Sequence, residues 1–312
     1  MTMRPKLLSD LKVMRGKDVS QWYGDVMGAW GSLNHATGEH SPMLWRNLGY
    51  WNDCSETLNQ AATNMATRLA DAAQVRAGCD VLDVGCGLGE STFLLRDRLD
   101  RTTSKLVGLD ITERHIDLAI ARRVGDRPEF MVGNATDMPF DDASFDRILA
   151  LECAFHFPDR RRFFAEALRV LRPGGVLGMA DVVVATGPVR MRRWLNTVLP
   201  RRARDRVEWF ESVILKTPSA NLVTLAEYVD QLRGAGFVTS GSEDISDHVF
   251  PYFREYWRTS NDRAAQENAL RSAGLDVAQA HAYASAWRRQ MRIFMLSWPI
   301  SRYVIVTARK PA

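Results

Sequence analysis

A glycine-rich turn is the first feature of the sequence that could do chemistry. The segment Asp83-Val84-Gly85-Cys86-Gly87-Leu88-Gly89 follows an apolar run and precedes a helical pattern. Glycines let the backbone turn tightly and approach a ligand, while the start of the helix offers N–H groups. The spacing is G-x-G-x-G, not the G-x-G-x-x-G of dinucleotide-binding proteins. An amino-acid carboxylate would suit these donors as well as a pyrophosphate.

An acid follows the next apolar run of the chain. Asp110 ends the segment Leu106-Val107-Gly108-Leu109-Asp110. A carboxylate at the end of the second strand can accept protons from both hydroxyls of a ribose, as in other doubly wound folds. The glycine turn and the acid together indicate a nucleoside ligand. The alternative is a structural turn and an acid at a helix start.

A histidine stands after the fourth apolar run, at the edge of a sheet where open α/β folds bind ligands. This residue, His156, is a candidate general base. Imidazole has an ordinary pKa of about 6.5, so its neutral form can take a proton from an attacking hydroxyl. The alternative is a loop histidine whose ring nitrogens bind the backbone.

Strands and helices that alternate between Asp80 and Asp181 predict a parallel sheet with helical crossovers. The expected strands span residues 81–84, 105–109, 129–132, 145–151 and 176–184. Helices are expected from near Gly89, after Thr112 and after Asp159, and Pro173-Gly174-Gly175 should stop the last one.

The flanking segments predict a helical cover and two further strands. Before about Trp51, aromatic residues among polar ones indicate a helical lid, and a helix capped by Ser55 should run to about Ala73. Beyond Val184 the pattern is helical and aromatic-rich, and Thr224 forms a capping box with Glu227 before the final strands. Those strands, 237–245 and 303–309, should form an antiparallel pair at one edge of the sheet.

The expected fold is therefore a doubly wound α/β fold with a seven-stranded, mostly parallel sheet. Residues 1–74 would form the lid and the first core helix, and residues 75–184 the ligand-binding core. Residues 185–312 would add a helical cap and the closing strand pair.

Length and composition fit a cytoplasmic enzyme with one large domain, or with one domain plus a cap. The chain has 312 residues, 46% of them hydrophobic and 25% charged, which is enough to bury a full core. No apolar stretch approaches the roughly 20 residues that span a bilayer, so no membrane partner is expected. The net charge is only +4. Arginines between Arg190 and Arg206 alternate with apolar residues, which favours amphipathic helices over nucleic-acid binding.

The four cysteines argue for neither a metal nor a disulfide. Cys54, Cys79, Cys86 and Cys153 are widely spaced, with no C-x-x-C pair and no histidine at zinc spacing. No cluster of carboxylates suits a hard cation either. We therefore expect no bound metal.

Four segments resemble the class I S-adenosylmethionine (SAM) methyltransferases in order and spacing: LDVGCGLG, GNATDMPFDDASFD, LECAFHFPD and VLRPGGVL. They cover about residues 81–184. The resemblance implies SAM as cofactor and S-adenosylhomocysteine as product. It also implies a set of cofactor contacts: the methionine carboxylate at Gly85 and Gly87, ribose at Asp110, adenine at Asn134 and Ala135, Ile111 on the adenine face, and Asp83 and Leu151 in the same pocket. Family members often have Asp where Asn134 stands.

The likeness extends further to O-methyltransferases that complete macrolide antibiotics, notably on a sugar hydroxyl of erythromycin precursors. Residues 47–51, the helix after them, residues 152–157 and residues 308–310 carry it. Related enzymes methylate glycosylated alkaloids, sterols and prenyl diphosphates. The resemblance implies a small-molecule substrate from antibiotic or other secondary metabolism, with His156 as the base and Asp181 orienting its ring.

Aromatic residues of the lid could also act on the methyl donor. Rings at Tyr50 and Trp51 would attract a sulfonium and exclude water, or would simply pack an amphipathic segment. Glu152 is a candidate supporting acid near the same pocket.

Several alternatives remain open at this point. A non-catalytic binding module is disfavoured because the glycines, Asp110 and His156 are all present. Nucleic-acid methylation is disfavoured because Glu152-Cys153-Ala154-Phe155-His156 stands where an Asn/Asp-Pro-Pro-Tyr/Phe segment is usual. The acceptor atom is most simply oxygen. The main alternative is C-methylation of a prenyl, terpenoid or sterol-like double bond, followed by N-methylation, and a homo-oligomer stays open.

Overall fold

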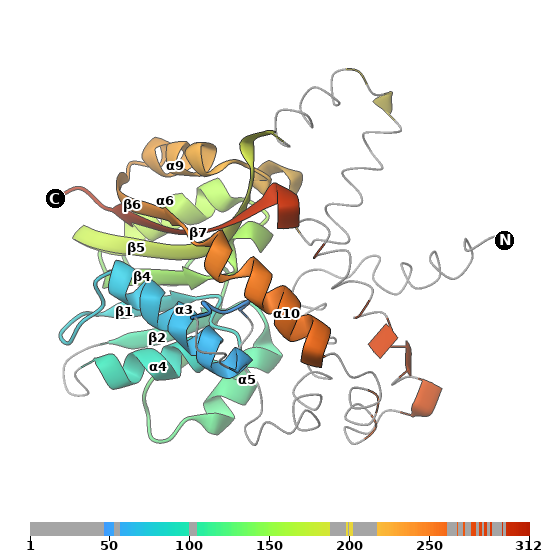
Figure 1. The fold of residues 1–312 in the computed structure, drawn as a ribbon. Helices are drawn as coiled ribbons and strands as arrows, with labels where there is room; N and C mark the ends of the chain where they lie inside the picture. Colours follow the sequence, from blue (N-terminus) through green and yellow to red (C-terminus); the bar gives the residue numbers. More distant parts are fainter. Residues whose placement is uncertain are drawn as a thin grey trace.

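The computed structural model contains one seven-stranded sheet in the order β3-β2-β1-β4-β5-β7-β6 (Figure 1). The strands are β1 (Val81–Val84), β2 (Leu106–Asp110), β3 (Glu129–Val132), β4 (Phe145–Leu151), β5 (Leu171–Val184), β6 (Val238–Asp244) and β7 (Ser301–Arg309). Strand β7 runs antiparallel to both β5 and β6, and the other strand pairs are parallel. The expected doubly wound, mostly parallel sheet is confirmed.

The structure describes residues 47–52, 57–99, 105–187, 217–260 and 298–312, with isolated positions between 198 and 201 and between 267 and 295. The expected lid before residue 47 lies outside these residues, as do nearly all of the expected helices over 190–206. The division into residues 1–74, 75–184 and 185–312 stays a prediction.

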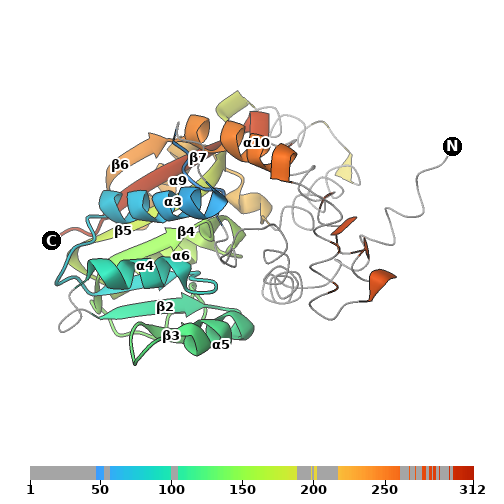
Figure 2. The same cartoon turned by 60° about the horizontal axis from the view of Figure 1, so that its bottom comes forward.

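Helices cover both faces of the sheet. On one face, α3 (Leu58–Ala72), α4 (Glu90–Arg98) and α10 (Phe250–Ser260) share a core with the strands, and Figure 2 shows α3 and α4 across that face. On the other face, α6 (Arg160–Val170) and α9 (Leu225–Gly234) form a second core. Helix α5 (Glu113–Arg122) packs on β2 and β3. No helix among the described residues is long and apolar enough to cross a membrane.

The observed helix caps agree in part with those expected from the sequence. Thr224 and Glu227 form the expected capping box of α9, and Asp159 caps α6 by accepting the Arg162 N–H. Helix α3 begins later than expected, because Thr57 and Gln60 form its capping box where Ser55 was expected to be the cap. A reciprocal box satisfies two backbone N–H groups at once, which favours this start.

Strand β5 begins before the point predicted from the sequence. The expected stop at Pro173-Gly174-Gly175 lies inside the strand, which starts at Leu171. Leu171 pairs with Phe145, and the register then shifts before Arg147 meets Val176. Gly174 has a positive φ of 74° and its N–H donates to the Lys310 carbonyl at 3.0 Å. The proline and glycines therefore form an irregularity in the strand, where a missing N–H is tolerated.

The described cysteines, Cys79, Cys86 and Cys153, are free thiols. Cys54 lies outside the described residues. Among the described side chains, no group of three or more His, Cys, Asp or Glu residues is placed to hold a metal ion.

Arg172 joins three strands at the amino end of the parallel sheet and yields a first prediction. Its guanidinium donates to Asp80, before β1, and to Asp146, in β4, both at 2.8 Å. Because the Arg172 side chain is 40% exposed, solvent screens these ion pairs. We expect Arg172→Ala to lower the free energy of unfolding by about 1 kcal/mol. Urea denaturation measures this change, and an unchanged midpoint would contradict the assigned role.

Candidate functional site

The glycine turn after β1 packs against the end of β4. A Cβ on Gly85 would lie 2.6 Å from the Cys153 Cβ, so only glycine fits there. Gly85 and Gly87 have positive φ values of 67° and 54°. Apart from Gly87 and its two chain neighbours, no described residue has an atom within 4 Å of where a Cβ on Gly87 would stand.

The N–H groups of this turn are used inside the protein, which differs from the expectation that they hold a ligand carboxylate. Gly85 donates to the Leu109 carbonyl at 2.7 Å, and Gly87 donates to Asp110 Oδ2 at 2.9 Å. These bonds tie the turn to the end of β2. Both donors already have partners inside the protein, and the expected contact of a ligand carboxylate with Gly85 and Gly87 stays a prediction.

Asp110 is an ionised, fixed acceptor at the end of β2. Its Oδ1 accepts the Thr112 N–H at 2.8 Å and lies 3.5 Å from His115 Nδ1. Burial alone would raise the pKa of Asp110, but the hydrogen bond and charge of His115 and the N–H groups of Thr112 and Gly87 lower it below its ordinary value. The next residue, Ile111, is 52% exposed, which leaves an apolar surface beside the carboxylate.

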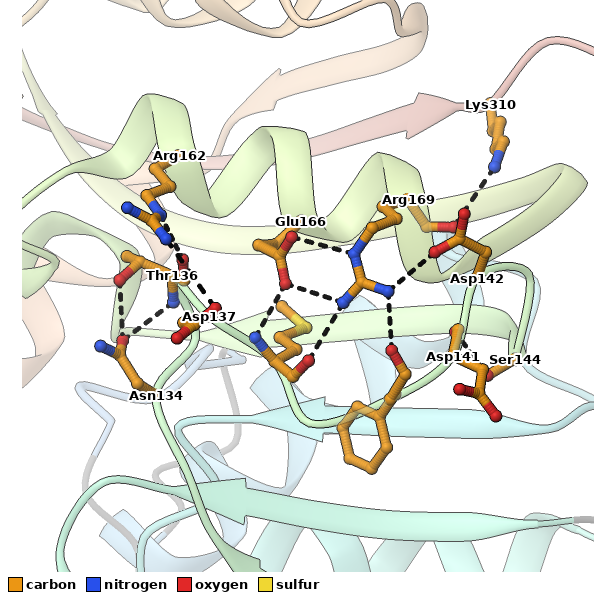
Figure 3. A network of polar contacts seen from close by, with 12 residues as sticks. Asn134, Thr136, Asp137, Asp141, Asp142, Ser144, Arg162, Glu166, Arg169 and Lys310 are labelled. Atoms are coloured by element: carbon orange, nitrogen blue, oxygen red, sulfur yellow. Dashed lines mark hydrogen bonds and ion pairs between the residues drawn. The ribbon is translucent and has the colours of Figure 1, made fainter.

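The loop after β3 carries Asn134 and Ala135, the residues expected at the adenine. Asn134 is exposed, and its Oδ1 accepts from both the N–H and the hydroxyl of Thr136 at 2.9 Å. Ala135 is buried. Arg162 of α6 donates to the Thr136 carbonyl at 2.8 Å and so fixes this turn from the helix side (Figure 3).

Arg169 fastens the rest of the same loop to α6, as Figure 3 shows. Its guanidinium donates to the carbonyls of Met138 and Phe140 at 3.0 and 2.7 Å. It also pairs with Glu166, whose Oε2 accepts the Met138 N–H at 2.8 Å. The residues expected at the adenine therefore stand on a loop that α6 holds rigidly in place.

Asp83 lies within β1 and binds the start of α4. Its Oδ2 accepts the hydroxyls of Ser91 and Thr92, both at 2.6 Å. Burial raises the pKa of Asp83 to about 6, although the two hydroxyls oppose the shift. The carboxylate thus fixes the helix that follows the glycine turn.

Glu152 connects the end of β4 with two distant segments. It has a positive φ of 51°, and its Oε1 accepts the Leu48 N–H at 2.7 Å and the Tyr303 hydroxyl at 2.6 Å. Burial raises the pKa of Glu152 to about 7, with both hydrogen bonds opposing the shift. The expected supporting acid is therefore the attachment point of the segment around Leu48.

Tyr50 and Trp51 belong to that attached segment. The Tyr50 ring stacks on His248 at 4.7 Å between centroids, and the Arg68 guanidinium lies 4.7 Å from its centre. Trp51 is buried, and its indole N–H donates to the Leu48 carbonyl at 2.8 Å. Both rings contact other parts of the protein, and the expected role of either ring beside a sulfonium stays a prediction.

His156 ends a short 3-10 helix, Ala154–His156, after β4. Its N–H donates to the Cys153 carbonyl at 3.0 Å, and its ring is tilted against Phe155 with centroids 4.0 Å apart. The side chain is half-buried. His156 therefore stands at the carboxyl edge of the sheet, in a compact turn that limits its freedom.

Asp181 lies in β5 at the same edge and is fully buried. Its Oδ1 accepts the Val182 N–H at 2.9 Å, and its Oδ2 accepts the Tyr228 hydroxyl at 3.0 Å. The Phe155 N–H also donates to this carboxylate. Burial raises the pKa of Asp181 to about 6, with Arg160 and these donors opposing the shift. The carboxylate thus contacts the residue next to His156 through the backbone.

The structure brings the sequence-predicted site residues to one edge of the sheet. Gly85, Asp110, Asn134 and His156 follow or end four neighbouring strands, and Leu151 ends β4. Three further residues support this edge and are not evident from the sequence: His115, Asn221 and Tyr228. Only spatial proximity reveals them, because they come from helices and turns that show ordinary patterns.

The raised pKa of Glu152 predicts a pH-dependent stability difference. The carboxyl has an ordinary pKa of 4.5 and one of about 7 in the folded protein, so the folded state favours the neutral form. The contribution of the neutral Glu152 carboxyl to the free energy of unfolding is present below pH 4.5 and is lost as pH rises to about 7. Glu152→Gln keeps an acceptor oxygen without the charge, so its stability relative to the unchanged protein should rise over this range.

The total change should be on the order of 1–3 kcal/mol. Denaturation of both proteins at a series of pH values measures it, since the other buried acids contribute equally to each. A difference that stays constant between acid and neutral pH would contradict a buried carboxyl at this position.

Comparisons with known proteins identify the family. A model of the methyltransferase domain matches residues 82–179, from β1 into β5. Erythromycin 3''-O-methyltransferase from Saccharopolyspora erythraea is 34% identical over 85% of this chain and 83% of that protein. The 27-O-demethylrifamycin SV methyltransferase from Amycolatopsis mediterranei is 34% identical over 86% of this chain and 92% of that protein.

A solved structure shows the same fold at lower identity. Geranyl diphosphate C-methyltransferase from Streptomyces coelicolor A3(2), in complex with Mg²⁺, geranyl-S-thiolodiphosphate and S-adenosyl-L-homocysteine, superposes with a TM-score of 0.61 at 17% identity. The match covers 94% of this chain and 99% of that chain. The matched domain spans the strands that carry the glycine turn and Asp110. The chain therefore belongs to the class I S-adenosylmethionine-dependent methyltransferases of natural-product biosynthesis.

Proposed function

We propose that this enzyme methylates a hydroxyl group of a lipophilic natural product of the macrolide or ansamycin kind. The observation that carries the proposal is the extent of the likeness to two methyltransferases named for oxygen positions of such molecules. It spans 85% and 86% of the chain, well beyond the domain that binds the cofactor. Parts of the chain outside that domain are the ones expected to shape an acceptor pocket.

The residues at the carboxyl edge fit SAM. The space above Gly87 suits the methionine part, which would pass over both glycines of the turn. The Asp110 carboxylate would accept from the ribose hydroxyls, and the exposed Ile111 would pack on the adenine between Asn134 and Ala135. Asp83 and Leu151 support this pocket from β1 and β4, and Tyr50 closes it from the segment held by Glu152.

Asn134 departs from the usual acid of the family, and its hydrogen bonds suggest how it works. Its Oδ1 is held by Thr136, so the side chain is fixed before any ligand arrives. An amide oxygen has two lone pairs and both are directed at Thr136. Asn134 therefore acts mainly by shaping the loop around the adenine.

His156 supplies the base in this proposal. Bound SAM supplies a methyl group on a positively charged sulfur, which keeps the electron pair of the broken sulfur–carbon bond as the acceptor oxygen bonds to the methyl carbon. His156 takes the proton that the hydroxyl loses, and its ring becomes cationic. The buried Asp181 carboxylate holds the turn at Phe155. In this proposal its negative charge also stabilises the cation.

A panel of acceptors tests the function directly. The purified enzyme is incubated with SAM and, separately, with 27-O-demethylrifamycin SV, an erythromycin with a free 3''-hydroxyl, and geranyl diphosphate. Mass spectrometry follows the gain of one methyl group. Methylation of either hydroxyl acceptor supports the proposal. Turnover of geranyl diphosphate alone would replace it with C-methylation, and a parallel series with EDTA tests the expected independence from metal.

Asp110 gives a prediction that needs no acceptor. Asp110→Ala removes the ionised acceptor for the ribose and should weaken SAM binding by roughly 1.5–3 kcal/mol for each charged hydrogen bond lost. Isothermal titration calorimetry with SAM measures the loss. Asn134→Ala should cost less, because its contribution is indirect. Unchanged affinity in Asp110→Ala would remove this residue from the binding site.

His156 gives a prediction about the chemical step. A base in hydrogen-bond reach typically contributes about 10²–10⁴-fold, so His156→Ala should lower kcat by a factor in that range. SAM affinity should stay the same. In the unchanged enzyme kcat/KM should rise with pH as imidazole becomes neutral, and this ascending limb should vanish in His156→Gln. Near-normal turnover by both variants on the true acceptor would exclude the base role.

A further inference from the structure

Asn221 contacts the backbone on both sides of His156. It ends a short 3-10 helix, Ser219–Asn221, and is buried, with 4% of its surface exposed. Its Nδ2 donates to the Phe155 carbonyl at 3.1 Å and to the Phe157 carbonyl at 2.7 Å. An asparagine amide has two N–H donors, and these two bonds use both.

The backbone N–H of Phe155 is held in place as well as its carbonyl. Its N–H donates to the Asp181 carboxylate, which the Tyr228 hydroxyl and the Val182 N–H hold in place. Two buried side chains from different strands and turns therefore hold the peptide groups on either side of Phe155. The turn that carries His156 cannot rotate without breaking bonds to one or both of them.

Arg160 in turn fixes Asn221. This arginine is almost fully buried and donates to the Asn221 carbonyl at 3.4 Å. It also donates to Gln231 at 3.0 Å and lies 4.3 Å from the centre of the Tyr228 ring. A buried guanidinium is costly unless it is well paired, and here it links the supports of Asn221 and of Asp181.

We propose that Asn221 is a positioning residue for His156: it fixes the turn so that the imidazole stands ready to take the proton of the acceptor. The inference rests on the proposed function, because it assigns Asn221 to the same proton transfer. A displacement of about 1 Å at a reacting group can cost about 10²-fold in rate. A hydrogen bond that merely stabilises the fold would not act on that step alone.

The first test needs no acceptor. Hydrogen exchange followed by mass spectrometry reports on the peptide 153–158 in the full-length protein. In Asn221→Ala this peptide should exchange faster, while Arg172→Ala serves as the control because it removes hydrogen bonds at the opposite end of the strands. Asn221→Leu, which keeps the volume and loses the donors, provides a second variant if the alanine variant folds poorly. Unchanged protection of 153–158 in both Asn221 variants would overturn the inference.

The second test is a double-mutant cycle on an acceptor of the panel that turns over. Asn221→Ala should lower kcat about 10–10²-fold with unchanged SAM affinity, and should cause no further loss in His156→Ala. An equal loss in both backgrounds would overturn the positioning role and leave His156 as the base. Full turnover of a hydroxyl acceptor by His156→Ala itself would exclude the base role, and the inference with it, while leaving the proposed O-methylation in place.

Discussion

The site depends on where the strand order of the sheet reverses. From β1 the chain continues through α4 on one face, and from β4 it continues through α6 on the other. The two connections diverge, and a crevice forms outside the carboxyl ends of these adjacent strands. Gly85 and Cys153 meet at its base, where the Cys153 thiol donates to the Val84 carbonyl at 3.2 Å. Any side chain at Gly85 would push the two strand ends apart.

Three buried acids line this edge of the sheet, and they share the same kind of hydrogen bond and the same direction of pKa shift. Asp83, Asp181 and Glu152 each accept a hydrogen bond from a hydroxyl group. Burial raises the pKa of all three, to about 6, 6 and 7. At a pH above these pKa values the three carboxyl groups are negatively charged, and their charges favour a positively charged ligand such as a sulfonium. Each hydroxyl also fixes the element from which it comes.

The local parts of the fold could be predicted from the sequence. Strands β1, β3 and β4 begin and end as expected, because short apolar runs bounded by turn residues define them. The glycine turn and Asp110 were predictable for the same reason, since they lie at strand ends. The sequence predicts too short a strand β5, because proline usually interrupts a strand. Only the pairing with β4 shows that β5 tolerates Pro173.

The supports of the site could not be predicted, because they depend on long-range pairing. Glu152 and Tyr303 lie 151 residues apart in the chain and meet only when β7 joins the sheet. Asn221 reads as an ordinary turn residue before the capping box of α9, and nothing in its neighbours points to Phe155. The glycine turn could be predicted as a candidate ligand site, but the bonds from its N–H groups to the end of β2 could not.

The place of β7 has a consequence for synthesis of the chain on the ribosome. Residues 301–309 form an interior strand, paired with β5 on one side and β6 on the other, yet they are made long after β5. Until they emerge, the 14 residues of β5 present an open edge that could pair with another nascent chain. Strand β6 likewise has no partner in the sheet before β7 arrives. The core around β1, β2 and β4 can therefore form during translation, whereas one flank of the molecule stays exposed to misassembly until the last strand is released.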